Sequence, residues 1–309
     1  MTELDGGAVL VLTNRLDPTA DLVVTHLNTR GVPVFRCDTA DFPTEVTMTA
    51  TLTDGWGGVL DDGHRRLSLS EVRSVYFRRP EEFLLPDGMS EAGRRFAAAQ
   101  SRAGFLGVTA SLPCLWINHP ARDANANYKP WQLAVAHRLG LNPPRTLITN
   151  DPYAARKFAA DLGAPMITKS LGAPVETVIV DPADLDGSVE LCAHLFQEWM
   201  DKAYEVRLTV VGDQFFPVEI HAGSDAARID WRTDYASLTY KPTTAPREVR
   251  ERLTAFMRHF GLVFAAFDFI VTPDGEWRFL EVNPNGQWSW IGATRSRALR
   301  VNSQIGGRL

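Results

Sequence analysis

Two apolar segments near the C-terminus, joined by a short turn, constrain the fold of this chain most strongly. Residues 264–271 and 277–282 are rich in aromatic and aliphatic side chains, and Pro273-Asp274-Gly275 lies between them. A turn sequence between two such segments predicts a β-hairpin. Because paired strands place opposite residues on the same face, the hairpin also predicts which side chains lie close together.

Three oxygen-bearing side chains occur on this hairpin, at Asp268 on the first strand and at Glu281 and Asn283 on the second. Glu281 and Asn283 share a face because strand side chains alternate, and a loop over residues 273–276 places Asp268 opposite Glu281. Buried carboxylates this close repel each other unless a cation lies between them. Oxygen ligands suit Mg²⁺, which commonly bridges nucleotide phosphates. We therefore predict a magnesium site, since the aromatic neighbours disfavour a solvated polar face.

Three cations form a second group of candidate site residues: Lys129, Lys169 and Arg207. Lys169 ends an apolar segment and precedes a turn of small residues, 170–174, which could close over phosphates. Arg207 lies in an apolar strand beside Glu205, and a charge buried there needs a partner. Taken singly, each of these cations is more often a solvent-facing side chain, so that alternative stays open. The chain has no GxxxxGK[ST] motif, which excludes a Walker-type P-loop.

The composition narrows the class of protein. The chain has 309 residues and a formal net charge of -5, so nothing in it requires the basic face of a nucleic-acid binder. Its three cysteines are scattered and form no CxxC pair, which suits a reducing compartment. The apolar run 8–12 is too short for a signal peptide or a membrane span. We therefore expect a cytoplasmic protein with neither a nucleic-acid nor a membrane partner.

The fold class is α/β, with α+β subdomains toward the C-terminus. The apolar run 8–12 predicts a strand buried on both faces. A helix beginning at Asp17-Pro18-Thr19 and a strand over 32–35 follow it, an order that favours a right-handed parallel unit. No GxGxxG follows the first strand, so the phosphate loop of a dinucleotide fold is absent from the sequence. We divide the chain into residues 1–115, 116–194 and 195–309.

The order of these parts resembles the ATP-grasp superfamily. The series begins with a lysine on a helix, Lys129, and a lysine that ends a strand, Lys169. It continues with residues 197–200, Glu205-Val206-Arg207 and Asp268. It ends with Glu281-Val282-Asn283-Pro284-Asn285-Gly286. The resemblance implies an ATP-grasp fold behind an N-terminal pre-ATP-grasp α/β domain, with ATP and Mg²⁺ as cofactors. It implies that phosphates are contacted by Lys129, Lys169 and Arg207, that Glu205 binds the ribose, and that Mg²⁺ is held by Asp268, Glu281 and Asn283. The implied adenine slot, read by backbone amides, consists of Gln197, Glu198, Trp199 and Met200.

Four further motifs resemble a narrower family, the microviridin-type or graspetide peptide maturases. They are Phe77-Arg78-Arg79-Pro80, Lys129-Pro130-Trp131-Gln132-Leu133, Asp230-Trp231-Arg232 and Asn285-Gly286-Gln287-Trp288. Members join an Asp or Glu side chain of a ribosomal precursor peptide to a Thr or Ser hydroxyl, or to a Lys amine, guided by a leader segment. The resemblance implies that Asp230 and Arg232 lie at the core-peptide site, Arg232 holding a carboxylate. It also implies leader binding near the hairpin 206–220, and a homodimer.

The implied chemistry is formation of an acyl phosphate followed by attack of the nucleophile. Lys169 and Arg207 would stabilise the charge that develops during phosphoryl transfer, and the turn around Gly172 is a candidate lid. No histidine is an evident general base, and Glu219 is only a weak candidate. Two alternatives stay open: an ATP-grasp ligase for free amino acids or small carboxylates, and a non-catalytic ATP-binding regulatory protein. These motifs do not distinguish ester from amide products. They also do not specify the ring pattern or the precursor sequence.

Overall fold

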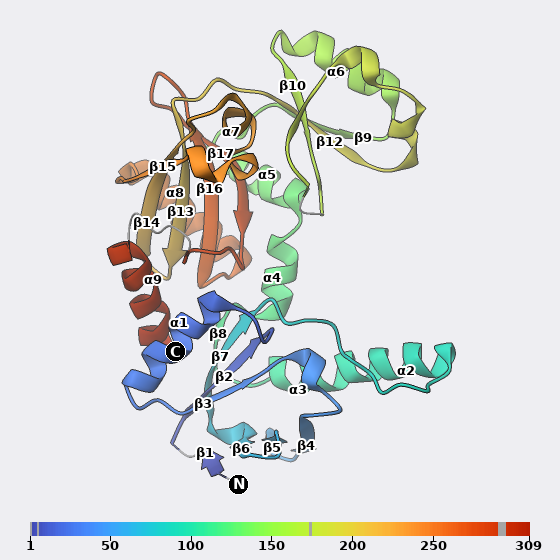
Figure 1. The fold of residues 1–309 in the computed structure, drawn as a ribbon, viewed down its shortest axis with the longest axis vertical. Coiled ribbons are helices and arrows are strands. Elements are labelled where there is room, and N and C mark those ends of the chain that lie inside the picture. The colour runs from blue at the N-terminus through green and yellow to red at the C-terminus, as the bar shows by residue number, and fades with distance from the viewer. Residues whose placement is uncertain (1, 5, 173–174, 290–294) are drawn as a thin grey trace.

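The computed structural model describes residues 2–4, 6–172, 175–289 and 295–309, which form four β-sheets flanked by helices (Figure 1). The N-terminal part lies at the bottom of the view, and two further lobes lie above it, linked to it through the helices α4 and α5. Nothing in the described residues forms a helix that is both long and apolar enough to cross a membrane.

The N-terminal part is built on a parallel sheet with the strand order β3-β2-β7-β8. Its elements are β2 (Ala8–Thr13), α1 (Pro18–Thr29), β3 (Val34–Cys37), β7 (Val72–Arg78), α2 (Glu91–Ser101), α3 (Gly107–Ala110) and β8 (Leu115–Ile117). The helix α1 begins where expected, because Asp17 accepts hydrogen bonds from the amides of Thr19 and Ala20. The predicted parallel unit is confirmed, although β3 starts two residues later than predicted, after Pro33, which has no amide hydrogen for the ladder.

A second, smaller sheet completes the N-terminal part. It has the order β1-β6-β5-β4 and consists of β1 (Thr2–Leu4), β4 (Thr47–Leu52), β5 (Trp56–Asp61) and β6 (Arg65–Ser68). Leu60 and Leu67 from this sheet pack in one apolar cluster with Leu10 of β2. The two sheets therefore share a core.

The central part is an antiparallel sheet with the order β11-β10-β12-β9, covered by α6. It is preceded by α4 (Pro120–Ala126) and α5 (Lys129–Arg138), and it contains β9 (Thr146–Thr149), α6 (Pro152–Leu162), β10 (Met166–Lys169), β11 (Val178–Val180) and β12 (His194–Glu198). The predicted helix start at Asp151 is confirmed, since its side chain caps α6. The predicted division after residue 115 falls within β8, and that after residue 194 within β12. The domain boundaries stay a prediction.

The C-terminal part is a five-stranded antiparallel sheet with the order β15-β14-β13-β16-β17. Its elements are β13 (Tyr204–Val211), β14 (Gln214–His221), α7 (Asp225–Ile229), β15 (Thr239–Pro242), α8 (Arg247–Phe260), β16 (Phe264–Val271), β17 (Trp277–Asn283) and α9 (Arg295–Arg308). Both predicted hairpins are confirmed, as β13–β14 and β16–β17. The helix α8 is also confirmed, and it ends at Gly261, whose φ of 66° suits glycine.

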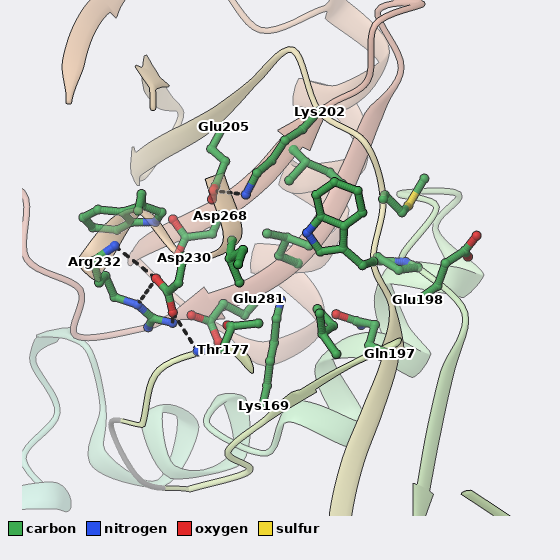
Figure 2. Close-up of a pocket in the computed structure, with 18 of the residues that line it drawn as sticks. Lys169, Thr177, Gln197, Glu198, Lys202, Glu205, Asp230, Arg232, Asp268 and Glu281 are labelled. Atoms are coloured by element: carbon green, nitrogen blue, oxygen red, sulfur yellow. Dashed lines mark hydrogen bonds and ion pairs between the residues drawn. The ribbon is translucent and has the colours of Figure 1, made fainter. Parts of the chain in front are cut away.

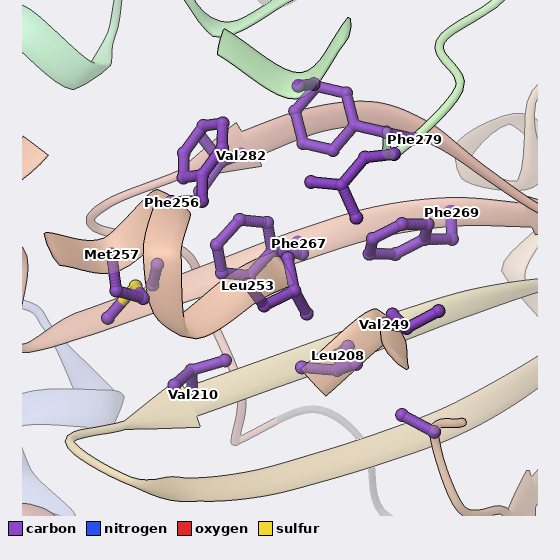
Figure 3. Close-up of a cluster of buried hydrophobic side chains, with 14 of the residues drawn as sticks. Leu208, Val210, Val249, Leu253, Phe256, Met257, Phe267, Phe269, Phe279 and Val282 are labelled. Atoms are coloured by element: carbon purple, nitrogen blue, oxygen red, sulfur yellow. The ribbon is translucent and has the colours of Figure 1, made fainter. Parts of the chain in front are cut away.

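The alternation of side chains in this sheet separates an apolar core from a polar face. Leu208 of β13 and Phe267 of β16 pack against Phe256 of α8 in the largest apolar cluster (Figure 3). Arg207 and Asp268 are the neighbours of these residues in sequence, so they point to the opposite face of the sheet. The same packing that stabilises the sheet therefore directs these charged groups toward one site.

The last helix ties the C-terminal part back to the N-terminal part. Val301 and Ile305 of α9 share an apolar cluster with Val23 and Leu27 of α1, and Figure 1 shows the two helices side by side. The hydroxyl of Ser74 on β7 donates a 2.8 Å hydrogen bond to the carbonyl oxygen of Leu309. The helix α9 therefore packs against the N-terminal part of the chain.

Candidate active site

A cavity that is partly open to solvent lies between the central sheet and the polar face of the C-terminal sheet. Its lining includes nearly every residue that the sequence predicted for ATP and peptide binding: Lys129, Lys169, Gln197, Glu198, Trp199, Met200, Glu205, Asp230, Arg232, Asp268 and Glu281. Figure 2 shows Lys169 of the central sheet and Asp268 and Glu281 of the C-terminal sheet pointing into this space. Tertiary folding thus brings together residues more than 150 positions apart in sequence, such as Lys129 and Glu281.

Asp268 and Glu281 form the acidic centre of the cavity. They are direct partners in the β16–β17 ladder, as predicted, and both line the cavity. Burial raises the pKa of Asp268 to about 6, and the nearby Arg207 only partly offsets this effect. Burial also acts to raise the pKa of Glu281, but Lys129 and Lys169 outweigh it and hold that pKa below its ordinary value. Glu281 therefore stays ionised to a lower pH than Asp268 does.

Three cations surround this acidic pair. Arg207 on β13 is the ladder partner of Asp268, and its Nε lies 2.7 Å from Asp268 Oδ1. Lys129, the first residue of α5, places Nζ 3.1 Å from Glu281 Oε2 and donates a 2.6 Å hydrogen bond to the carbonyl of Ser170. Lys169 ends β10, and burial lowers its pKa. The predicted pairing of Arg207 with a buried partner is thus present.

Asn283 lies two residues beyond Glu281 on β17, opposite Ala266, and therefore on the same face. Its Oδ1 accepts a 3.0 Å hydrogen bond from the amide of Asn285. Asn283 lines an adjoining cavity that is open to solvent, together with Asp123 and Arg79. The predicted triad is therefore divided, with Asp268 of β16 and Glu281 of β17 lining the first cavity and Asn283 of β17 lining the second. Among the described residues, no three His, Cys, Asp or Glu side chains form a metal-binding group.

Asp230 and Arg232 form a bidentate ion pair at the wall of the first cavity. The distances are 2.9 Å from Arg232 Nε to Asp230 Oδ1 and 2.7 Å from Nη2 to Oδ2. Asp230 Oδ2 also accepts a 2.9 Å hydrogen bond from the amide of Thr177, in the segment that follows β10 (Figure 2). Burial acts to raise the pKa of Asp230, but the Arg232 guanidinium and these hydrogen bonds hold it well below its ordinary range. The pair links the central and C-terminal sheets across the cavity.

The predicted adenine slot lies at the end of β12. The amides of Glu198 and Trp199 donate 2.9 Å hydrogen bonds to the carbonyls of Arg145 and Pro165. Gln197 donates from Nε2 to Thr146, while its buried Oε1 accepts no hydrogen bond from any residue that the structure describes. An unsatisfied buried oxygen in a cavity wall is a position for a donor on a ligand.

Several residues that support the site were missed by the sequence analysis. Lys202 forms an ion pair with Glu205, the predicted ribose ligand, and lines the same cavity (Figure 2). Gln132 of α5 holds β17 in place, because its side chain accepts from the amide of Val282 and donates to the carbonyl of the same residue. The spacing of Lys202 and Glu205 offered a weak signal in the sequence. No feature of the sequence indicated that Gln132 contacts β17.

Two further polar side chains hold the loop that follows β17. Asn118 donates hydrogen bonds of 2.8 Å and 2.9 Å to the carbonyls of Phe264 and Pro284. Arg78 is fully buried, with Nε 2.7 Å from Asp17 Oδ2, and it donates from Nη1 to the carbonyl of Asn285 at 3.1 Å. Arg78 is therefore a buried structural side chain and does not lie at a solvated strand end. These contacts fix the loop after β17 to the N-terminal sheet.

The chain is similar in sequence and structure to several known proteins. A family model described as the MvdD pre-ATP grasp domain matches residues 8–124. The structure of the macrocyclase MdnC from Microcystis aeruginosa MRC, bound with precursor peptide MdnA, is 34% identical with a TM-score of 0.85, and the match covers 99% of this chain and 98% of that one. Macrocyclase MdnB from the same organism is 30% identical with a TM-score of 0.82, covering 97% and 98%.

A more distant likeness shows the fold alone. The RiPP-associated ATP-grasp ligase of Chryseobacterium gregarium, in complex with ADP and with a leader and core peptide, is 23% identical. Its TM-score is 0.87, and the match covers 99% of this chain and 96% of that one. Comparison with curated protein sequences gives no match.

Proposed function

The chain belongs to the microviridin-type ATP-grasp macrocyclases, and we propose that it uses ATP to cross-link a ribosomally made precursor peptide. It phosphorylates an Asp or Glu side-chain carboxylate and joins it to a Thr or Ser hydroxyl, or to a Lys amine. The observation that carries this proposal is the cavity lined by Asp268, Glu281, Lys129 and Lys169, with Arg207 paired to Asp268 at its edge. Such a set of charges suits the binding and transfer of a phosphoryl group.

ATP binds with its base at the end of β12 and its phosphates toward β17. The buried Oε1 of Gln197 is placed to accept a hydrogen bond from an amino group such as that of adenine. The amides of Glu198 and Trp199 already donate to backbone carbonyls, so Met200 is the hinge residue whose amide we expect to meet the base. Glu205, held by Lys202, is placed for the ribose hydroxyls.

The donor set fits magnesium. Asp268 and Glu281 offer carboxylate oxygens on paired strands, and Asn283 lies two residues beyond Glu281 on the same strand. Buried carboxylates with a raised pKa, as at Asp268, are stabilised in the ionised form by a nearby cation. These residues would hold Mg²⁺, which would supply charge neutralisation to the nucleotide phosphates.

In the first step, an oxygen of the peptide carboxylate attacks the γ-phosphorus of ATP, ADP leaves, and an acyl phosphate forms. Lys169 and Arg207 stabilise the negative charge on the transferred group, and Lys129 does so from α5. Their low exposure strengthens this effect, since charges act more strongly where water is excluded. This arrangement accounts for catalysis by positioning and electrostatics, without a nucleophile on the enzyme.

In the second step, the hydroxyl or amine attacks the acyl carbon, phosphate leaves, and an ester or amide remains. The peptide thereby loses one water overall. Water must be kept from the acyl phosphate, and the segment after β10 is suited to this role because Thr177 is tied to Asp230 across the cavity. The predicted lid turn 170–174 includes residues 173 and 174, which lie outside the described residues.

Two regions are proposed to contact the peptide. The Asp230–Arg232 pair presents a fixed guanidinium at the cavity wall for the core segment. The leader segment is expected beside the β13–β14 hairpin, where an open groove is lined by Phe215 and Phe216 on one side and by Ser303 of α9 on the other. A groove that combines these aromatic side chains with polar and charged ones suits a peptide that must be held before it is modified. We also propose that the protein acts in the cytoplasm, consistent with its free cysteines, and as a homodimer.

The test is ADP release from the purified protein with Mg-ATP, with and without full-length candidate precursor peptides, while the peptide is followed by mass. Peptide-dependent ADP release with successive losses of one water supports the proposal. ADP release with free amino acids alone would instead support a small-molecule ligase. ATP binding without turnover on any acceptor would support a regulatory role, and either result would reject peptide cross-linking.

A further inference from the structure

Two of the three proposed magnesium ligands, Glu281 and Asn283, lie on β17, the strand at the edge of the C-terminal sheet. An edge strand has a neighbouring strand on one side only, so the backbone groups on its other side need partners from elsewhere. Val282 stands between the two ligands, and its side chain points into the apolar core (Figure 3), away from theirs. A contact that holds the backbone of Val282 therefore also holds the ligands on either side of it.

The ladder between β16 and β17 is irregular beside one of these ligands. Asp268 pairs with Glu281, but the next residue on β16, Phe269, pairs with Phe279, so that Leu280 is an extra residue on β17. A bulge of this kind bends the strand and changes the direction of nearby side chains, and bulges are common beside active sites. The direction of Glu281 therefore depends on contacts from outside the sheet as well as on the ladder.

Gln132 of α5, which is only 2% exposed, supplies such a contact. Its Oε1 accepts a 3.0 Å hydrogen bond from the amide of Val282, and its Nε2 donates a 2.9 Å hydrogen bond to the carbonyl of the same residue. One side-chain amide thus takes the place of a neighbouring strand at the position between the two ligands. Nε2 also donates a 2.6 Å hydrogen bond to the carbonyl of Ala126 at the end of α4, which fixes the orientation of the amide.

The same edge of β17 is anchored again on the other side of the bulge, where the amide of Phe279 donates a 3.0 Å hydrogen bond to the carbonyl of Leu141. The two anchors bracket the bulge and Glu281. Gln132 also lies three residues after Lys129 on α5, and residues with that spacing share a helix face. The first turn of α5 therefore carries both the backbone anchor of β17 and the cation whose Nζ lies 3.1 Å from Glu281.

We propose that Gln132 is a positioning residue for the magnesium site: by holding the backbone of Val282, it sets how tightly the two ligands on β17 bind the metal. This inference rests on the proposed function, because it takes the metal ligands from there. Gln132 is not itself a ligand, since both polar atoms of its side chain are engaged by Val282 and Ala126. Groups that orient metal ligands in this way change metal affinity by roughly 10- to 100-fold when they are removed.

The experiment measures magnesium binding apart from catalysis. ADP is titrated into the full-length protein by isothermal titration calorimetry at a series of Mg²⁺ concentrations, for the wild type and for Gln132→Met, which keeps a side chain of similar length without the hydrogen bonds. We expect the affinity for ADP in the absence of Mg²⁺ to be unchanged. The Mg²⁺ concentration that gives half of the increase in ADP affinity should rise by roughly 10- to 100-fold. An unchanged Mg²⁺ requirement, or an equal loss of ADP affinity with and without Mg²⁺, would overturn the inference.

A double-mutant cycle with Asn283→Ala tests whether Gln132 acts through β17. In the Asn283→Ala protein one of the positioned ligands is already absent, so Gln132→Met should raise the Mg²⁺ requirement by a smaller factor than it does in the wild type. Two changes whose effects multiply in full would show that Gln132 acts independently of this strand, against the proposal.

Two further variants separate positioning from general stability. Gln132→Met leaves the amide and carbonyl of Val282 without their partner, which lowers thermal stability. Gln132→Asn keeps the amide on a shorter side chain and should raise the Mg²⁺ requirement by a smaller factor, so it carries the test if the Met protein does not fold. Thr109→Val is the matched structural control, because it removes a buried 2.8 Å hydrogen bond to the carbonyl of Phe105 in the N-terminal part.

Thr109→Val should lower the melting temperature and leave the Mg²⁺ requirement as in the wild type. A rise in the Mg²⁺ requirement equal to that of Gln132→Met would assign the effect to lost stability and reject the positioning role. Peptide-dependent ADP release by the wild type is scored separately, so that failure of this inference is distinct from failure of the proposed function.

Discussion

Asp268 and Glu281 face each other across two antiparallel strands, yet each carboxylate has a cation of its own: Arg207 at 2.7 Å from Asp268 and Lys129 at 3.1 Å from Glu281. This arrangement keeps two acidic groups together in a site of low exposure. A metal ion bound here must therefore share the carboxylate oxygens with Arg207 and Lys129, or displace these two cations from them. The following predictions test how much the site depends on each part.

Removing Glu281 should abolish peptide-dependent ADP release. Glu281→Ala deletes a metal oxygen and leaves Lys129 without its carboxylate, so we expect kcat to fall by roughly 100-fold or more. The matched control is Glu276→Gln, an exposed carboxylate at the turn of the same hairpin, which should keep wild-type activity. Steady-state ADP release at saturating ATP measures both, and comparable activity in the two variants would contradict the assigned role.

The magnesium requirement should depend on pH. The pKa of Asp268 is raised to about 6, so below that pH a proton competes with the metal for its oxygens. The Mg²⁺ concentration for half-maximal ADP release should therefore rise as the pH falls from 6 toward 5, by roughly tenfold per unit if one proton is displaced. Above pH 7 it should be flat, because Asp268 is ionised there and Glu281 has a lowered pKa. A requirement that is constant from pH 5 to 8 would argue against Asp268 as a ligand.

The buried Arg78–Asp17 pair should be essential for folding. Arg78→Met leaves Asp17 as an uncompensated buried charge, and we expect a loss of roughly 3–5 kcal/mol in the free energy of unfolding. Adding Asp17→Asn should recover part of this loss, because the unpaired charge is removed while a side-chain acceptor for the α1 amides remains. Urea unfolding followed by circular dichroism gives both values.

A surface pair provides the control for that comparison. Arg95→Ala breaks the exposed Arg95–Glu91 ion pair on α2 and should change the unfolding free energy by less than about 1 kcal/mol. Equal losses from Arg78→Met and Arg95→Ala would show that burial of the first pair has no energetic consequence.

Gly286 should tolerate no side chain. A Cβ atom there would lie 2.4 Å from the Cβ of Ala266 and 3.3 Å from the carbonyl oxygen of Asn283, so the loop would have to move. We expect Gly286→Ala to cost roughly 1–3 kcal/mol of stability and to lower kcat. Gly187→Ala is the control, because nothing lies within 4 Å of its added Cβ. Thermal unfolding and ADP release should separate the two variants.

The sequence by itself determined the local elements and the face on which the charged residues lie. The turn at Pro273-Asp274-Gly275 and the two-residue period of the flanking strands were enough to predict that Asp268 pairs with Glu281, as the ladder has it. Motif order was enough to predict the ATP-grasp fold, which the similarity to the macrocyclase MdnC supports. The strand pairing depends on local sequence and the fold prediction depends on the order of motifs, so both can be predicted from the sequence alone.

The tertiary structure alone decided which distant groups meet. Gln132 binds β17 from 150 positions away, and Arg78 of the N-terminal sheet holds the loop at Asn285 from 207 positions away. No period or spacing in a sequence encodes such contacts, because they depend on how separately formed sheets pack against one another. The same packing left Arg79 facing a cavity while the adjacent Arg78 became buried. Two neighbouring arginines thus differ in burial because of how the sheets pack around them.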